Sequence, residues 1–105
     1  MTSVTRLTGG GAPAANFVNI TAAAPTTTVV ATTPCTLRYI TFNKPVATGV
    51  VTLYHGPTVA AGVVFGIITT PASPIPVTLE YHIALPSGLT ITSATAAQDI
   101  TVVWD

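Results

Sequence analysis

The chain has 105 residues, 49% of them hydrophobic, and its six formally charged side chains sum to zero net charge. A typical soluble domain is about 25% charged, so the 6% found here leaves little electrostatic repulsion to oppose association. Three basic residues that form no cluster argue against direct nucleic-acid binding, and the longest nearly apolar run, 59–68, is too short for a membrane-spanning helix. The composition predicts one domain with an assembly role.

The N-terminal residues differ in composition from the rest of the chain. Residues 2–8 precede a stretch rich in Gly and Ala, 9–15, which is typical of a flexible linker. We therefore divide the chain into an extended N-terminal arm, 1–15, and a domain, 16–105. No basic segment followed by an apolar one resembles a secretion signal, which predicts synthesis and retention in a cytosol. We expect the arm to reach a neighbouring chain, where it could add a strand to a sheet edge.

Val, Ile and Thr are abundant and helix-favouring residues are scarce, so the chain is expected to be all-β. Eight strands are predicted, separated by turns rich in Pro, Gly and Asn; they span 16–21, 26–32, 36–43, 49–55, 63–70, 75–83, 88–93 and 100–104. Strands at roughly 8–12-residue spacing indicate a β-sandwich or a barrel. We predict a single antiparallel sandwich.

Alternation of apolar and polar residues is clearest in two strands. In 75–83 and 100–104 it predicts a core face that consists of Ile75, Val77, Leu79, Tyr81, Ile83, Ile100, Val102 and Trp104. In 36–43 the apolar phase slips between Tyr39 and Ile40, which predicts a bulge or burial on both faces. The lone Cys35 is expected to be a small buried side chain.

Glu80 and His82 are expected to lie side by side on the outward face of their strand, close enough to hydrogen-bond or to share a metal ion. A zinc site usually needs three or four protein ligands, and only His55 offers a third, without a spacing that forces convergence. We interpret Glu80 and His82 as a contact pair and predict no metal and no cofactor.

The sequence contains the residue types of two kinds of catalytic site, but not their motifs. Cys35 with His55 or His82 would give a nucleophile and a base, and Ser87 or Ser93 with His and Asp would give a triad, but no local motif supports either. We predict that the protein is not an enzyme.

Tyr54 is out of phase with its apolar neighbours Val51 and Leu53, so we expect it to be an exposed contact. A cluster of exposed aromatic side chains would instead favour a carbohydrate-binding module. The predicted interface residues are Val4, Arg6, Leu7, Tyr54, His55, Glu80 and His82.

Three segments carry a resemblance to a known group of proteins: LPSGLTIT at 85–92, DITVVWD at 99–105 and TLYHG at 52–56. Together they resemble strands of small β-sandwich proteins from tailed-bacteriophage virions. Among these, proteins of this length with an N-terminal arm are similar to capsid decoration, or cement, proteins. The resemblance implies a jelly-roll fold and binding across neighbouring major capsid subunits on the virion surface, after assembly in the host cytoplasm.

The same resemblance implies a homotrimer, with a dimer as the alternative. A weakly polar surface also suits such a role, because Thr, Ala and Val desolvate at lower cost than Lys or Glu. A tail, baseplate or head-fibre adaptor of the virion is the alternative structural role.

Overall fold

The computed structural model describes residues 16–21, 25–94 and 98–105, which form eight strands and no helix. The strands are β1 (Asn16–Ile20), β2 (Thr26–Ala31), β3 (Cys35–Lys44), β4 (Val50–His55), β5 (Val63–Thr69), β6 (Val77–Leu85), β7 (Leu89–Ser93) and β8 (Asp99–Trp104). Every predicted strand is present, with bounds that shift by no more than two residues. The described residues accordingly contain no helix that could cross a membrane.

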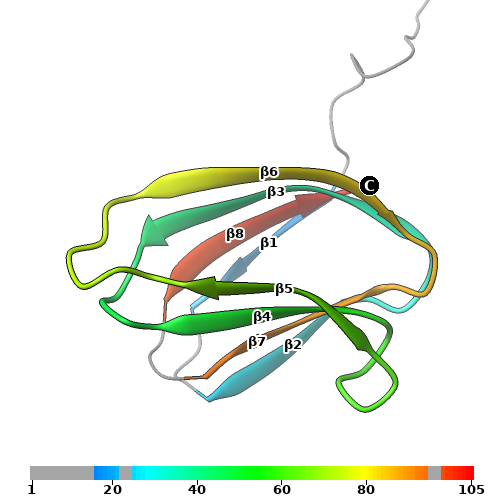
Figure 1. Cartoon of the computed structure of the whole chain (residues 1–105). Coiled ribbons are helices and arrows are strands. Elements are labelled where there is room, and N and C mark those ends of the chain that lie inside the picture. The colour runs from blue at the N-terminus through cyan, green and yellow to red at the C-terminus, as the bar shows by residue number, and fades with distance from the viewer. Residues whose placement is uncertain (1–15, 22–24, 95–97) are drawn as a thin grey trace, which may run out of the picture.

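The strands form two antiparallel four-stranded sheets that pack face to face (Figure 1). Sheet A has the order β1-β8-β3-β6 and sheet B has the order β2-β7-β4-β5. The first strand thus pairs with the last, the second with the seventh, the third with the sixth and the fourth with the fifth. This is the pairing of one long eight-stranded hairpin that is folded over on itself, which is a jelly roll. The predicted all-β antiparallel sandwich is confirmed.

The core lies between the sheets, where the inward rows of both meet. In sheet A one inward row consists of Ile20, Ile100, Phe42 and Val77, and in sheet B another consists of Thr28, Ile91, Leu53 and Gly66. Phe42 and Leu53 are completely buried. Cys35 is also buried in this core, as predicted.

The phase slip predicted in β3 is a bulge that lies one residue earlier than expected. Leu37 pairs with Trp104 and Tyr39 pairs with Val103, so β3 has one more residue than β8 at this point. The additional residue is Arg38. It allows Leu37 and Ile40 both to point inward and to be fully buried, although they are three residues apart.

The apolar side chains of β6 are less buried than the alternation of apolar and polar residues in the sequence predicted. Leu79, Tyr81 and the terminal Trp104 of β8 pack against the core, but Val77 is 44% exposed and Ile83 is 37% exposed. Ile75 lies outside the strand and is 74% exposed. The reason is that β6 is the edge of sheet A in the described part of the chain, where its side chains have a neighbouring strand on one side only.

Gly88 ends the tight turn between β6 and β7 with a φ of 104°, a conformation that side chains with a Cβ rarely adopt. A Cβ at this position would approach the carbonyl oxygen of Ala31 to 2.3 Å. The turn brings Gly88 beside Ala31, the last residue of β2.

Candidate interaction surface

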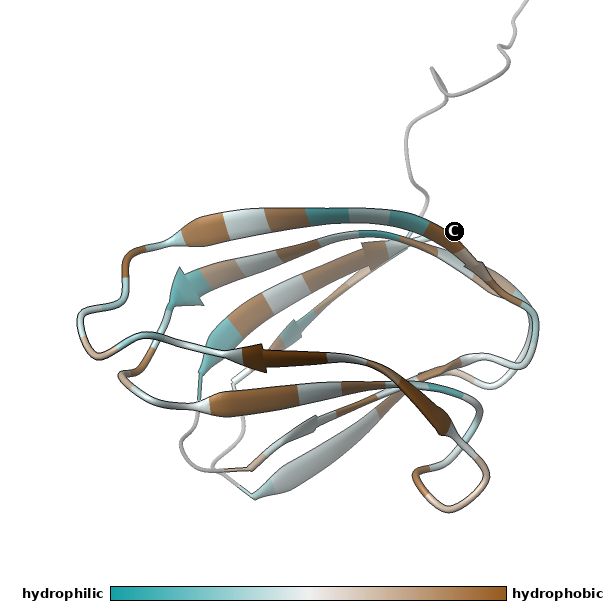
Figure 2. Ribbon diagram, viewed as in Figure 1, coloured by the Kyte–Doolittle hydropathy of each residue, from teal (hydrophilic) through white to brown (hydrophobic). Residues whose placement is uncertain are grey.

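Charge is segregated between the two sheets. The strands of sheet B read TTTVVA, LTITS, VVTLYH and VVFGIIT and contain no Asp, Glu, Lys or Arg. The charged residues of the described segments all lie in the strands of sheet A or directly after β8; they are Arg38, Lys44, Glu80, Asp99 and Asp105. Figure 2 shows the difference, with strong teal bands in β6 and at the β3 and β8 ends. The described part of the molecule therefore has one charged outer face and one uncharged outer face.

The outer face of sheet B is built from two rows that run across all four strands. One row consists of Thr27, Thr92, Thr52 and Ile67, and the other consists of Val29, Thr90, Tyr54 and Val64. The alternate residues Val51, Leu53 and Ile91 are buried between the sheets, which is why these rows point outward. We call this surface, apart from Thr90, the uncharged face.

Thr90 is covered although its row points outward. Its hydroxyl donates to the carbonyl oxygen of Gly56 at 2.9 Å, and the loop from Gly56 to Gly62 lies against Tyr54. Tyr54 is therefore half-buried, less exposed than its phase in the sequence predicted. Its side chain belongs to the outward row with Val64 and Thr90.

Glu80 and His82 lie together on the outer side of sheet A, as predicted. His82 Nε2 lies 3.2 Å from Glu80 Oε2, and the two side chains are 43% and 68% exposed. The imidazole also meets the ring of Tyr39 edge to face, with 5.0 Å between ring centroids. The backbone of His82 has a φ of 48°, because β6 has an additional residue opposite the β3 bulge. This local twist aims the imidazole at Tyr39 and Glu80.

His55 lies in the other sheet, apart from this pair. It ends β4, and its Nε2 accepts a hydrogen bond from the backbone N–H of Ser87 at 3.0 Å. The neutral ring must therefore carry its proton on Nδ1. Within the described segments, no three His, Cys, Asp or Glu side chains gather as a metal site would require.

Of the residues in the catalytic sets considered above, His55 and Ser87 lie next to each other, but they are joined through the backbone of Ser87. Cys35 is buried opposite Leu85, and burial raises the pKa of its thiol, which disfavours the reactive thiolate. The hydrogen bond that His55 accepts from Ser87 comes from the backbone N–H and not from the hydroxyl, which would be the nucleophile. Ser93 is buried on the inner side of sheet B.

A polar cluster on sheet A was not predicted from the sequence. Asp99 Oδ1 accepts hydrogen bonds from Asn19 Nδ2 at 2.7 Å and from Asn43 Nδ2 at 3.1 Å, and both amides also reach Thr101. The amides of Asn19 and Asn43, aided by the charge of Lys44, lower the pKa of Asp99 below its ordinary value. The cluster joins β1, β8 and β3, which are far apart in sequence, so no local pattern could indicate it.

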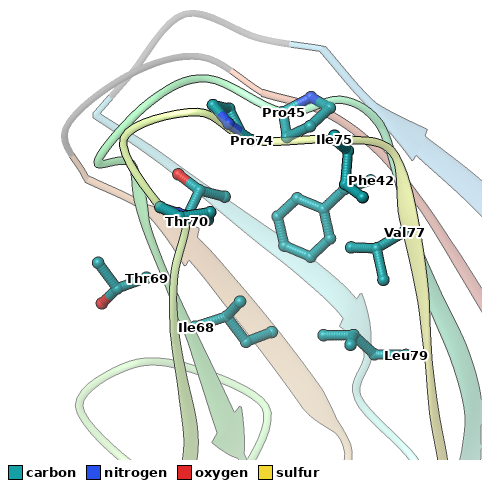
Figure 3. Close-up of a pocket in the computed structure, with 10 residues that line it drawn as sticks. Phe42, Pro45, Ile68, Thr69, Thr70, Pro74, Ile75, Val77 and Leu79 are labelled. Atoms are coloured by element: carbon teal, nitrogen blue, oxygen red, sulfur yellow. The ribbon is translucent and has the colours of Figure 1, made fainter.

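An apolar pocket of about 260 Å³ opens between β5 and β6, where the two sheets separate at the edge of the sandwich (Figure 3). Phe42, Ile68 and Leu79 form its inner wall, and Ile75 and Val77 lie along the β6 side. At its end, Thr70 fixes the loops by accepting the N–H of Gly49 at 2.8 Å and donating to the carbonyl of Val46. The pocket holds no charged group among its lining residues.

The aromatic side chains are divided among three places. Phe17, which is 74% exposed, and Tyr39 lie on the outer side of sheet A. Tyr54 lies on the uncharged face, and Phe65 and Tyr81 meet edge to face between the sheets at 6.1 Å. This distribution gives a carbohydrate-binding role no particular support.

The predicted interface residues of the N-terminal arm, Val4, Arg6 and Leu7, lie outside the described residues, as does the whole arm, 1–15. Of the other four, Tyr54 belongs to the uncharged face, His55 ends a strand of the same sheet, and Glu80 and His82 lie on the opposite sheet. The predicted set is therefore not one continuous surface.

The chain was compared with protein-family models, curated proteins and solved structures. None of the three comparisons found a match.

Proposed function

We propose that the chain is a structural protein of a tailed-bacteriophage particle, which binds the outer surface of the capsid and stabilises contacts between neighbouring major capsid subunits. The resemblance of segments 52–56, 85–92 and 99–105 to virion β-sandwich proteins supports the capsid as the partner. The observation that carries the docking role is the uncharged face. A surface of four strands without a single charged residue is unusual for a soluble protein.

The chemistry of this face suits a wide contact with another protein. Burial of a Lys or Glu costs several kcal/mol unless it finds a partner, whereas burial of Thr costs less and burial of Val is favourable. Their short, β-branched side chains also lose little rotamer entropy when a partner covers them. A flat sheet face such as the row of Thr27, Thr92 and Thr52 can therefore bind without specific ion pairs.

Attachment to a lattice further reduces the affinity that each contact needs. A self-associated protein touches several capsid subunits at once, so weak individual contacts combine through multivalency. The proposed partners are accordingly the major capsid protein and further copies of this chain. A tail, baseplate or head-fibre position in the same particle is the alternative.

The test uses two lysine substitutions at equivalent positions in the two sheets. Thr52 in β4 and Thr41 in β3 both point outward from an interior strand, one on each face. Purified capsids that lack this protein are incubated with wild type, Thr52→Lys or Thr41→Lys, and occupancy is measured by sedimentation and gel densitometry. We expect Thr52→Lys to weaken capsid binding at least about tenfold, because it buries an unpaired cation, and Thr41→Lys to bind like wild type.

Equal binding by both variants would contradict docking through the uncharged face. Wild-type protein that does not bind capsids at all would contradict the capsid role, and the same assay with purified tails then tests the alternative.

The arm is tested separately. Removal of residues 1–15 is expected to leave the sandwich folded but to lower capsid occupancy and the protection of capsids against heat, because one of several contacts is lost. Equal occupancy and protection would show that the arm does not anchor the protein.

A further inference from the structure

We propose that two copies of this chain pair through β5, so that their B sheets join edge to edge across a two-fold axis. Among the described strands, β5 is the outer strand of sheet B and hydrogen-bonds to β4 on one side only. Its other side presents a row of backbone N–H and C=O groups, which is a template for another strand. This inference is independent of capsid binding.

Of the three described edge strands that carry no charged residue, β5 is the longest. β6 carries Glu80 and the positive-φ residue His82, both of which discourage strand addition. β1 has only five residues, two of them Asn, and β2 has six. Both β2 and β5 contain a register irregularity, between Val29 and Ala31 in β2 and at Phe65 in β5. β5 has seven residues without charge or proline. Natural edges of this length usually carry Lys, Pro or an inward charge unless they are covered.

Exposed aliphatic side chains concentrate at this edge. Val63 is 68% exposed, Val64 46% and Ile67 65%. On the neighbouring β6 side, Ile75, Val77 and Ile83 are also exposed. Figure 2 shows both ends of β5 as strongly hydrophobic. Ile75 and Val77 also line the apolar pocket. Exposed apolar side chains gathered on neighbouring strands are typical of a surface that is covered by another molecule.

The faces of β5 select one register for the pairing. Leu53 pairs with Gly66 and Tyr54 with Val64, so Phe65 is an additional residue, and Val64 and Ile67 both point outward. An antiparallel partner must match outward with outward residues. A two-fold axis between Phe65 and Gly66 does so, because it places Val64 opposite Ile67 of the second copy. The same axis then places Ile67 opposite Val64 of the second copy.

Charge and area both favour a second copy as the occupant. A strand without charged residues meets its own copy without like-charge repulsion. A stable interface needs about 800 Å² from each partner, more than one strand edge provides. The exposed Val77 and Ile83 supply further apolar area, because β6 lies alongside β5 at the open edge of the sandwich (Figure 1). This two-fold arrangement favours the dimer over the homotrimer that the resemblance implies.

Single cysteine substitutions test the register. In the proposed dimer, Val64→Cys and Ile67→Cys chains place their thiols on directly opposed residues, with Cα atoms about 5 Å apart, within disulfide reach. In each variant alone, the two identical positions are offset by three residues, or about 10 Å along the strand, which is too far. The variants are oxidised with glutathione, separately and as a mixture, and analysed on non-reducing gels. The native Cys35 is buried and should not react.

We expect a covalent dimer in the mixture and none in either variant alone. A dimer that forms equally in one variant alone, or no dimer in the mixture, would overturn the proposed register.

A charge substitution tests the edge itself. Ile67→Lys introduces a lysine on β5, and Thr27→Lys introduces one in the same row of the same sheet but on the opposite edge strand, β2. Sedimentation equilibrium should show self-association at least about tenfold weaker for Ile67→Lys and unchanged for Thr27→Lys. Thermal melts check that both variants fold. A monomeric wild type, or equal self-association of Ile67→Lys and wild type, would overturn the proposal.

Discussion

Arg38 and Asp105 form an ion pair that begins at the β3 bulge. Arg38 donates from Nε at 2.9 Å and from Nη2 at 2.7 Å to the same oxygen, Oδ2 of Asp105. Asp105 also exchanges two backbone hydrogen bonds with Thr36, which continue the ladder of β8 past Trp104. Because the bulge leaves Arg38 opposite no residue of β8, its side chain is free to reach along the strand. The bulge in β3 thus places Arg38 where it can bind Asp105, the residue that follows β8.

We expect Arg38→Ala to lower the free energy of unfolding by about 1 kcal/mol or less, because partly exposed ion pairs contribute little. A double-mutant cycle with Asp105→Asn, measured by urea denaturation, isolates the coupling between the two side chains. The coupling should decrease in about 1 M salt, which screens exposed charges. Coupling that is absent at low salt would show that the pair is only a close approach.

Phe42→Ala should destabilise the fold by about 3–5 kcal/mol, because Phe42 is completely buried at the centre of an inward row. The matched control is Phe17→Ala, in which the same ring is removed from a side chain that is 74% exposed. We expect a change within about 0.5 kcal/mol for the control. Similar losses in both variants by chemical denaturation would contradict the assignment of the core.

Gly88→Ala should cost about 2 kcal/mol or more, because a Cβ would enforce an unfavourable φ and collide with the backbone oxygen of Ala31. Ser87→Ala, one residue earlier in the same turn, is the control; Ser87 is exposed, so its loss should change stability by less than about 0.5 kcal/mol. Differential scanning calorimetry measures both. An unchanged melting temperature for Gly88→Ala would mean that the turn relaxes without strain.

The pKa of Asp99 is lower in the folded chain than in the unfolded chain, chiefly because of the amide of Asn19 and then that of Asn43. The ionised carboxylate therefore stabilises the fold above its unfolded pKa of about 3.9, and this contribution is lost as the pH falls through the folded value. We expect Asn19→Ala to raise the pKa of Asp99, as followed by carboxyl NMR chemical shifts. Asn16→Ala on the same strand is the control, because Asn16 pairs with Trp104 at the other end of β8. An unchanged pKa in Asn19→Ala would exclude the hydrogen bond as its cause.

The candidate interaction surface could be read from the sequence only in part. The absence of charge from segments 26–31, 50–55, 63–69 and 89–93 is visible in the sequence. That these four segments form one sheet is not visible, because strand partners are chosen by contacts between residues far apart in the chain. For the same reason, the interface predicted from the sequence combined Tyr54 with Glu80 and His82. Tyr54 lies on sheet B, whereas Glu80 and His82 lie on the opposite face, on sheet A.

The sequence by itself determined the number of strands, their approximate bounds and the burial of residues such as Val102 and Cys35. These properties follow from alternation and turn residues, which are local and have a period of two. Only the tertiary structure decided which strands lie at the edges, and therefore why Val77 and Ile83 are exposed despite their apolar phase. Which strands lie at the edges depends on how all eight strands pair, and that pairing involves residues far apart in the chain. The same pairing places all the charged residues of the described strands in sheet A and none in sheet B.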